Sequence, residues 1–311
     1  MNSQTVSRGF VTIATGDEKY RQMAVNLLHS YKKYTANPYP FAVITDKTDE
    51  YTAEFDDVVV IDDARYTYLD KLTLWRDTPY DETIFIDSDT LAYADLNHWW
   101  DELEDADDFS VFGKCLDISS DKGWFYYDGI GKFQETVEFI PEFCGGVYFL
   151  RKTEKCRKVF ELAKYFEEHF YEYAFHKLYT KPADEPVFAL AMAAENCRPV
   201  DYEATIVNPV VKRLKTDTDK PLAEYKRFRG ETYTGSIVHW STFKTDLAYY
   251  KREVRRMQTH MPRGSIEKLA DRIRFGISCI ADIPKWIRLI YRKRKKIPSK
   301  IKRILKKYLG K

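Results

Sequence analysis

The chain lacks the features that mark secreted, membrane-spanning or zinc-binding proteins. Its five cysteines are odd in number and widely spaced, and none forms a C-x-x-C pair, which argues against a disulfide framework and a cysteine zinc site. There is no secretory signal at the N-terminus, and no apolar stretch approaches the roughly 20 residues of a spanning helix. We therefore expect a reduced, cytosolic chain without a transmembrane segment.

The chain also has little net charge, +2 over 311 residues, but its charge is unevenly distributed. Residues 251–311 contain 21 Lys and Arg against 4 Asp and Glu, a net of +17. Residues 1–250 contain 29 against 44, a net of −15. A chain of this length can bury a substantial core. We expect one large domain over residues 1–250 and a basic tail over 251–311.

Strands and helices alternate along the first part of the chain. Continuous apolar runs at 9–15, 41–45 and 58–61 predict buried strands, and helical spacing of apolar residues after Asp17 predicts a helix between the first two. Further strands are predicted at 83–87, 109–112, 145–150 and 236–240, helices at 71–75, 153–176 and from 184, a short helix from 99, and a long loop over 116–140. This order predicts an α/β fold with a mostly parallel sheet flanked by helices.

The strand at 83–87 ends in two carboxylates, Asp87 and Asp89, separated by Ser88. Residues i and i+2 of a strand point the same way, so the two side chains can converge on one cation as the strand ends. Hard oxygen ligands suit Mg²⁺ or Mn²⁺, which usually share their coordination shell with substrate phosphates. A capped turn is the alternative, because Asp also bonds nearby backbone N–H groups.

Several segments, taken in order, resemble the family-8 retaining glycosyltransferases of the GT-A fold over roughly residues 9–250. In the N-terminal part these are 14–20 (ATGDEKY), Lys71 and 86–90 (IDSDT). The resemblance implies that the loop at 14–20 holds the nucleotide and that Lys71 lies near the donor. It also implies that Asp87 and Asp89 in the segment at 86–90 bind the metal and that Ser88, between them, contacts the donor. The residues implied in the nucleotide loop are Thr15, Asp17 and Tyr20, with the acidic residue and the tyrosine on the uracil.

In the C-terminal part the resemblance covers 143–147 (FCGGV), Asp184-Glu185, His239 and Lys244. It implies that Gly145, Gly146 and the acidic pair lie beside the donor sugar. It also implies that His239 is the third metal ligand and Lys244 a diphosphate contact. Cys144 stands where the family has Asn, and Glu185 where it has Gln. Taken alone, each residue has a structural alternative: a turn for the glycines, a helix N-cap for Asp184, a core histidine for His239 and a surface lysine for Lys244.

The function implied is transfer of a hexosyl unit from a UDP-sugar to a glycan or lipid-linked acceptor, with retention and with Mn²⁺ or Mg²⁺. Asp184 and Glu185 are the candidate catalytic residues, Glu185 as a nucleophile or an electrostatic stabiliser. A sugar nucleotidyltransferase is one alternative, although such an enzyme normally carries a basic Gly-rich loop near its first strand, where this chain has the acidic ATGD at 14–17. A non-catalytic membrane-surface adaptor is another.

The basic tail from about residue 265 has the pattern of amphipathic helices. Ile280, Ile283, Trp286, Ile287 and Ile290 share a helical face, and a basic run follows at 292–296. A second such face is predicted for a helix starting near Pro298, with Ile297, Ile301, Ile304, Leu305 and Tyr308. We expect the tail to bind anionic lipid rather than nucleic acid and to hold the protein at the inner face of the cytoplasmic membrane. Packing on the acidic domain is the alternative.

Overall fold

The computed structural model describes residues 6–118, 137–173, 181–228 and 230–293, and every structural statement below concerns these residues. The chain divides into two compact units, 1–241 and 242–311. The units therefore divide somewhat before the predicted domain boundary, which followed residue 250. The predicted second helix of the tail, from Pro298, lies outside the described residues, as does most of the predicted loop at 116–140.

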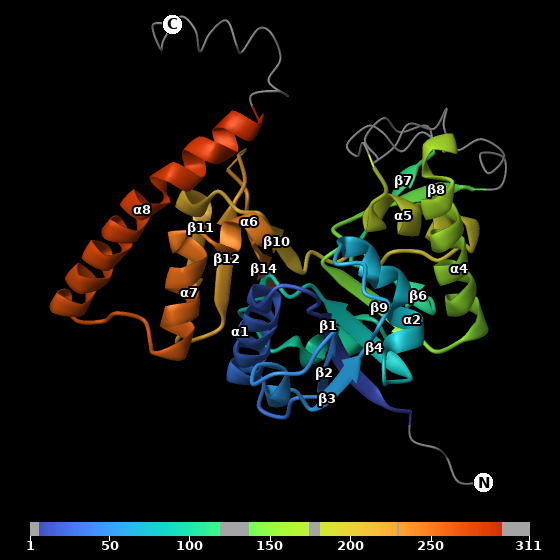
Figure 1. Cartoon of the computed structure of the whole chain (residues 1–311), viewed down its shortest axis with the longest axis horizontal. Coiled ribbons are helices and arrows are strands. Elements are labelled where there is room, and N and C mark those ends of the chain that lie inside the picture. Colours follow the sequence, from blue (N-terminus) through green and yellow to red (C-terminus); the bar gives the residue numbers. More distant parts are fainter. Residues whose placement is uncertain (1–5, 119–136, 174–180, 229, 294–311) are drawn as a thin grey trace, which may run out of the picture. The chain divides into compact units, whose positions relative to one another are not determined.

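A six-stranded sheet forms the centre of the first unit, in the order β3-β2-β1-β4-β9-β6 (Figure 1). Its first four strands are parallel, whereas β9 runs antiparallel to both of its neighbours. The strands are β1 (Arg8–Ile13), β2 (Phe41–Thr45), β3 (Asp57–Val60), β4 (Glu82–Ile86), β6 (Phe109–Ser110) and β9 (Val147–Arg151). The prediction of a mixed, mostly parallel sheet flanked by helices is confirmed.

Helices cover both faces of this sheet because its strands are apolar on both sides. Phe10 and its neighbours on one face pack with α1 (Glu18–Tyr34). Val11 faces the other way, into a cluster that includes α4 (Glu154–Glu168) and α5 (Asp184–Ala194). Figure 1 shows α1 on one side of the strands and α4 and α5 on the other. The continuous apolar runs of the sequence follow from this two-sided burial.

A second sheet of three short strands, in the order β10-β14-β5, adjoins the carboxyl end of β4. Its strands are β10 (Thr205–Val207), β14 (Ile237–His239) and β5 (Thr90–Ala92). β14 is the strand predicted at 236–240, whereas β5 and β10 were not predicted. Because β5 begins directly after Asp89, this sheet places the end of β14 beside the two carboxylates.

Two antiparallel groups and several short helices complete the first unit. The predicted loop at 116–140 begins and ends in strands, because β7 (Gly113–Asp117) pairs with β8 (Phe139–Phe143). A further unpredicted sheet consists of β11 (Leu214–Asp217), β12 (Leu222–Lys226) and β13 (Thr232–Thr234). The short helices are η1 (Thr52–Glu54), η2 (Tyr68–Thr73), α2 (Leu74–Asp77), η3 (Leu96–His98), α3 (Trp99–Glu102), η6 (Phe170–Glu172) and η7 (Val211–Arg213).

The second unit consists of α6 (Thr242–Thr245), α7 (Ala248–Gln258) and α8 (Ser265–Lys293). α8 is held to α7 by the buried carboxylate of Asp271, which accepts hydrogen bonds from arginines of α7. The buried Asp282 accepts one from the backbone N–H of Ala248 at 2.7 Å. Within the described part of the chain, no helix combines the length and hydropathy needed to cross a bilayer.

Candidate metal and donor site

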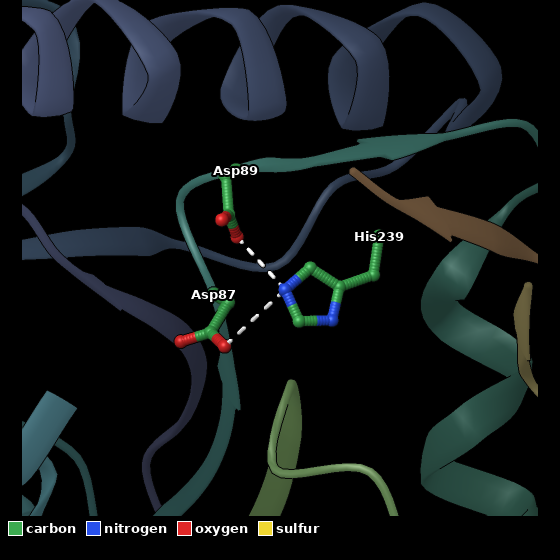
Figure 2. A group of neighbouring side chains, drawn as sticks. All are labelled: Asp87, Asp89 and His239. Carbon is green, nitrogen blue, oxygen red and sulfur yellow. Dashed lines mark ion pairs between the residues drawn. The ribbon is translucent and has the colours of Figure 1, made fainter. Parts of the chain in front are cut away.

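The carboxylates of Asp87 and Asp89 meet the imidazole of His239 at the carboxyl end of β4 (Figure 2). One ligand atom from each of the three lies within 4.8 Å of the others. His239 Nε2 is 3.0 Å from Asp89 Oδ1 and 3.7 Å from Asp87 Oδ2. Figure 2 shows this nitrogen pointing between the two carboxylates. The sequence prediction that these residues converge is therefore confirmed as geometry.

The backbone holds the three residues in place from two sheets. The N–H of Asp87 donates to the carbonyl of Gly146 at 2.9 Å, which ties the end of β4 to the start of β9. His239 stands opposite Thr90 in the pairing of β14 with β5. The N–H of Trp240 donates to the carbonyl of Asp89 at 3.0 Å. His239 is thus placed by strand pairing rather than by a flexible loop.

The three side chains form a half-buried group with excess negative charge. Burial raises the pKa of Asp87 to about 6, although Lys71 and His239 act to lower it. The pKa of Asp89 is lowered despite its burial, because it faces the His239 ring. Burial would lower the pKa of His239, but Asp89 and Cys144 outweigh it and raise that pKa. Two carboxylates and an imidazole so arranged fit a divalent cation such as Mn²⁺ or Mg²⁺.

Lys71 contacts this group through Asp87 and is buried in the 3₁₀ turn η2. Its ammonium donates to Asp87 Oδ2 at 3.0 Å, to Asp184 Oδ2 at 2.8 Å and to the carbonyl of Gly145 at 2.7 Å. Burial alone would lower the pKa of Lys71, but Asp184 and Asp87 raise it. A lysine has three N–H donors, and these three acceptors match them. Lys71 therefore joins the metal group to the acidic residues of α5.

Asp184 and Glu185 open α5 and both contact the start of β9. Asp184 Oδ2 accepts a hydrogen bond from the hydroxyl of Tyr148 at 2.9 Å, and Glu185 Oε1 accepts one from the N–H of Gly145 at 2.8 Å. A Cβ at Gly145 would lie 2.8 Å from Asp184 Oδ2, so only glycine fits there. Ala183, not Asp184, is the N-cap of α5, so the N-cap alternative for Asp184 is wrong.

The first loop, between β1 and α1, is held by carboxylates of other segments. Thr15 Oγ1 donates to the buried Asp70 at 2.8 Å, and the N–H of Gly16 donates to Asp46 Oδ1 at 2.8 Å. Asp17 is exposed and caps α1 through the N–H of Lys19 at 3.1 Å. Tyr20 packs partly buried on the core. The predicted uridine contacts of Thr15, Asp17 and Tyr20 stay predictions.

The remaining predicted residues differ in how directly the structure places them. Gly146 contacts the His239 ring. Ser88, which separates Asp87 from Asp89 in the sequence, is buried. Lys244 belongs to α6 in the second unit, so its predicted diphosphate contact stays a prediction. Sequence reasoning gave no role to Tyr148 or to Cys144, whose contacts come from segments far apart in the chain.

No family model and no curated protein matches this chain. Among solved structures, the chain is similar to the galactosyltransferase LgtC in complex with donor and acceptor sugar analogues (TM-score 0.49, 12% identity, 75% of this chain and 87% of that one). It is also similar to mouse xyloside xylosyltransferase 1 (TM-score 0.47, 11% identity, 76% and 98%). A third is the glycosyltransferase GlyE of Streptococcus pneumoniae (TM-score 0.45, 10% identity, 90% and 63%). These three are glycosyltransferases.

Proposed function

We propose that the chain is a metal-dependent glycosyltransferase that moves a hexosyl unit from a UDP-sugar to a glycan or lipid-linked acceptor, with retention. The group formed by Asp87, Asp89 and His239 carries the proposal. Its carboxylate and imidazole donors suit Mn²⁺ or Mg²⁺, ions that bind proteins through few carboxylates and share their shell with phosphates. Its place beyond the carboxyl end of a strand is where open α/β sheets bind ligands.

The protein side chains around this group have separate tasks in such a reaction. A bound divalent cation would neutralise charge on the departing diphosphate. Lys71 holds the carboxylates of Asp87 and Asp184 in place, since it donates to both. Glu185, oriented by the N–H of Gly145, would stabilise the positive charge that develops on the sugar or act as a nucleophile. Gly145 allows the acidic pair to lie close against the backbone, since an added Cβ there would be 2.8 Å from Asp184 Oδ2.

The test is a comparison of two substrate classes with and without Mn²⁺. We expect Mn²⁺-dependent hydrolysis of a UDP-hexose to UDP and hexose, lost in Asp89→Asn and retained in Asp63→Asn. Asp63 is a suitable control because it is an exposed carboxylate paired with Arg76. Turnover of nucleoside triphosphates with sugar phosphates instead would assign a nucleotidyltransferase. Turnover of neither class would leave the adaptor as the remaining interpretation.

We further propose that α8 lies on the anionic inner face of the cytoplasmic membrane. One face of α8 is apolar and exposed, with side chains 50% to 85% accessible at steps of three or four residues. These side chains are Ile266, Leu269, Ile273, Ile277, Ile280 and Ile283. Lys268, Arg272 and Arg274 belong to the same helix. An apolar face with adjacent cations suits the lipid interface, where each Lys or Arg contributes about 1 kcal/mol.

Flotation with vesicles of anionic phospholipid tests this location. We expect Ile273→Glu with Ile277→Glu to lose vesicle binding and to keep UDP-sugar hydrolysis. Tyr171→Glu is the control, because Tyr171 is 74% exposed on η6 of the first unit. A chain that ends near residue 260 should also fail to float. Equal flotation of the double variant and the unaltered protein would refute the proposal.

A further inference from the structure

The His239 ring has a second nitrogen, Nδ1, which points away from the carboxylates (Figure 2). The thiol of Cys144 lies 3.4 Å from this atom. Cys144 lies in the segment between β8 and β9, whereas His239 lies in β14. The contact between them is therefore a tertiary contact. Gly146 lies on the same side of the ring, where an added Cβ would be 3.0 Å from Nδ1. The ring is thus fixed between Asp89 at one nitrogen and Cys144 at the other.

Metal binding places a requirement on this second nitrogen. A histidine that binds a cation through Nε2 must carry its ring proton on Nδ1, and that proton needs an acceptor. Without the cation, a neutral ring can instead donate from Nε2 to Asp89, and Nδ1 is then an acceptor. A thiol suits both states, because its sulfur is a weak acceptor and its S–H a weak donor. A side chain with only one of these capacities would favour one state.

We propose that Cys144 is a positioning residue, whose thiol holds His239 in the Nδ1–H tautomer that presents Nε2 to a divalent cation. The inference rests on the proposed metal-dependent function, but it concerns affinity for the ion rather than transfer. Partners of this kind on metal-binding histidines change metal affinity by about 10- to 100-fold when they are removed. Cys144 therefore matters for how tightly the site holds the ion, although it does not touch the ion.

Small substitutions at Cys144 should be tolerated by the fold. The residue is half-buried, and it also lines a pocket of about 370 Å³ together with Glu142 and Val147. Because Cys144 lines this open pocket, a smaller side chain leaves no sealed cavity of the kind that destabilises a core. Cys144→Ala removes the partner of Nδ1, whereas Cys144→Ser keeps a group that can both donate and accept.

The experiment measures Mn²⁺ binding to the full chain by calorimetry, without donor or acceptor. We expect the dissociation constant of Cys144→Ala to rise about tenfold or more, and that of Cys144→Ser to stay close to the unaltered value. Cys115→Ala is the matched control, since Cys115 is an exposed cysteine of β7 and should leave the affinity unchanged. Unfolding temperatures of all four proteins without metal check that the fold is retained.

Nitrogen chemical shifts of the imidazole provide a second readout that a purely structural role would not change. At a Mg²⁺ concentration that saturates the unaltered chain, His239 should show the Nδ1–H tautomer in that chain. In Cys144→Ala, which binds the ion more weakly, the same concentration should leave a mixture of the metal-bound and metal-free rings. The imidazole signal of His239 is identified by its absence from the spectrum of His239→Gln. Either of two results would refute the role of Cys144 and leave the metal site standing. One is an unchanged Mn²⁺ affinity of Cys144→Ala; the other is a loss of Mn²⁺ affinity in Cys144→Ser as large as in Cys144→Ala. Absence of saturable Mn²⁺ binding by the unaltered chain would overturn the metal site, and the role of Cys144 with it.

Discussion

Lys71→Met is the substitution that tests the electrostatic design of the site most directly. Methionine keeps the approximate length of the side chain but removes the ammonium that donates to Asp87, Asp184 and the Gly145 carbonyl. Both carboxylates would then be buried without their cation, and Asp89 adds a further negative charge nearby. The variant therefore leaves uncompensated charge in the core of the site.

The expected loss of stability is large for one residue. Removing one partner of a buried ion pair costs about 3–5 kcal/mol, because the remaining charge is desolvated without compensation. Lys71 is only 6% exposed, so the buried value applies. Lys215→Met is the matched control: Lys215 pairs with Glu224 at 3.0 Å, but its side chain is 71% exposed. Exposed pairs of this kind contribute about 1 kcal/mol or less.

Urea unfolding in EDTA at neutral pH measures both variants. Adding Asp184→Asn to Lys71→Met should recover part of the loss, because it removes one of the two stranded charges. The same charges determine how the loss of stability in Lys71→Met changes with pH. Burial already raises the pKa of Asp87 to about 6. Loss of the Lys71 ammonium, which acts to lower this pKa, would raise it further above the unfolded value, so the added penalty shrinks as pH falls and Asp87 is protonated. A loss below about 1 kcal/mol, or one that does not shrink at acidic pH, would refute the reasoning.

Three further predictions concern the metal group. Asp87→Ala and Asp89→Ala should each abolish Mn²⁺ binding and transfer while circular dichroism shows a retained fold; full activity of either variant in EDTA would contradict the metal assignment. His239→Ala should weaken Mn²⁺ binding and UDP-sugar binding together, and an unchanged metal dependence of the rate would return His239 to a structural role. Because burial raises the pKa of Asp87 to about 6, protons should compete with the ion, so Mn²⁺ affinity should fall as pH drops through 6; calorimetry between about pH 8 and pH 5 measures this.

Much of the central sheet could be predicted from the sequence because its strands are buried on both faces. The runs at 41–44 and 84–86 are apolar without interruption, and the structure has β2 and β4 there. Some of the strands that were missed, such as β11 and β13, are short and half-exposed, and their residues are mostly polar. No periodicity distinguishes such segments from loops. The antiparallel direction of β9 also depends on the path of the chain between distant elements, which a local pattern does not contain.

The metal group could be predicted in part for a similar reason. Asp87 and Asp89 are neighbours in sequence at the end of a strand, so local geometry alone brings them together. From the sequence, His239 was assigned to this group only because its segment resembles that of the family-8 enzymes. Its position depends on the pairing of β14 with β5, a strand that was not predicted. The contact of Cys144 with His239 has no local signal, since 95 residues separate them.

Lys71 shows most clearly what a sequence pattern leaves open. The resemblance implied that Lys71, upstream of the strand at 83–87, lies near the donor, and the structure places its ammonium in contact with Asp87. Its ammonium, however, meets two carboxylates and a carbonyl, which match its three N–H donors. Because all three N–H groups of Lys71 donate to protein acceptors, Lys71 orients the anionic ligands and lowers the cost of burying them. Charge on the leaving diphosphate would then be met by a bound cation held on Asp87, rather than by Lys71 itself.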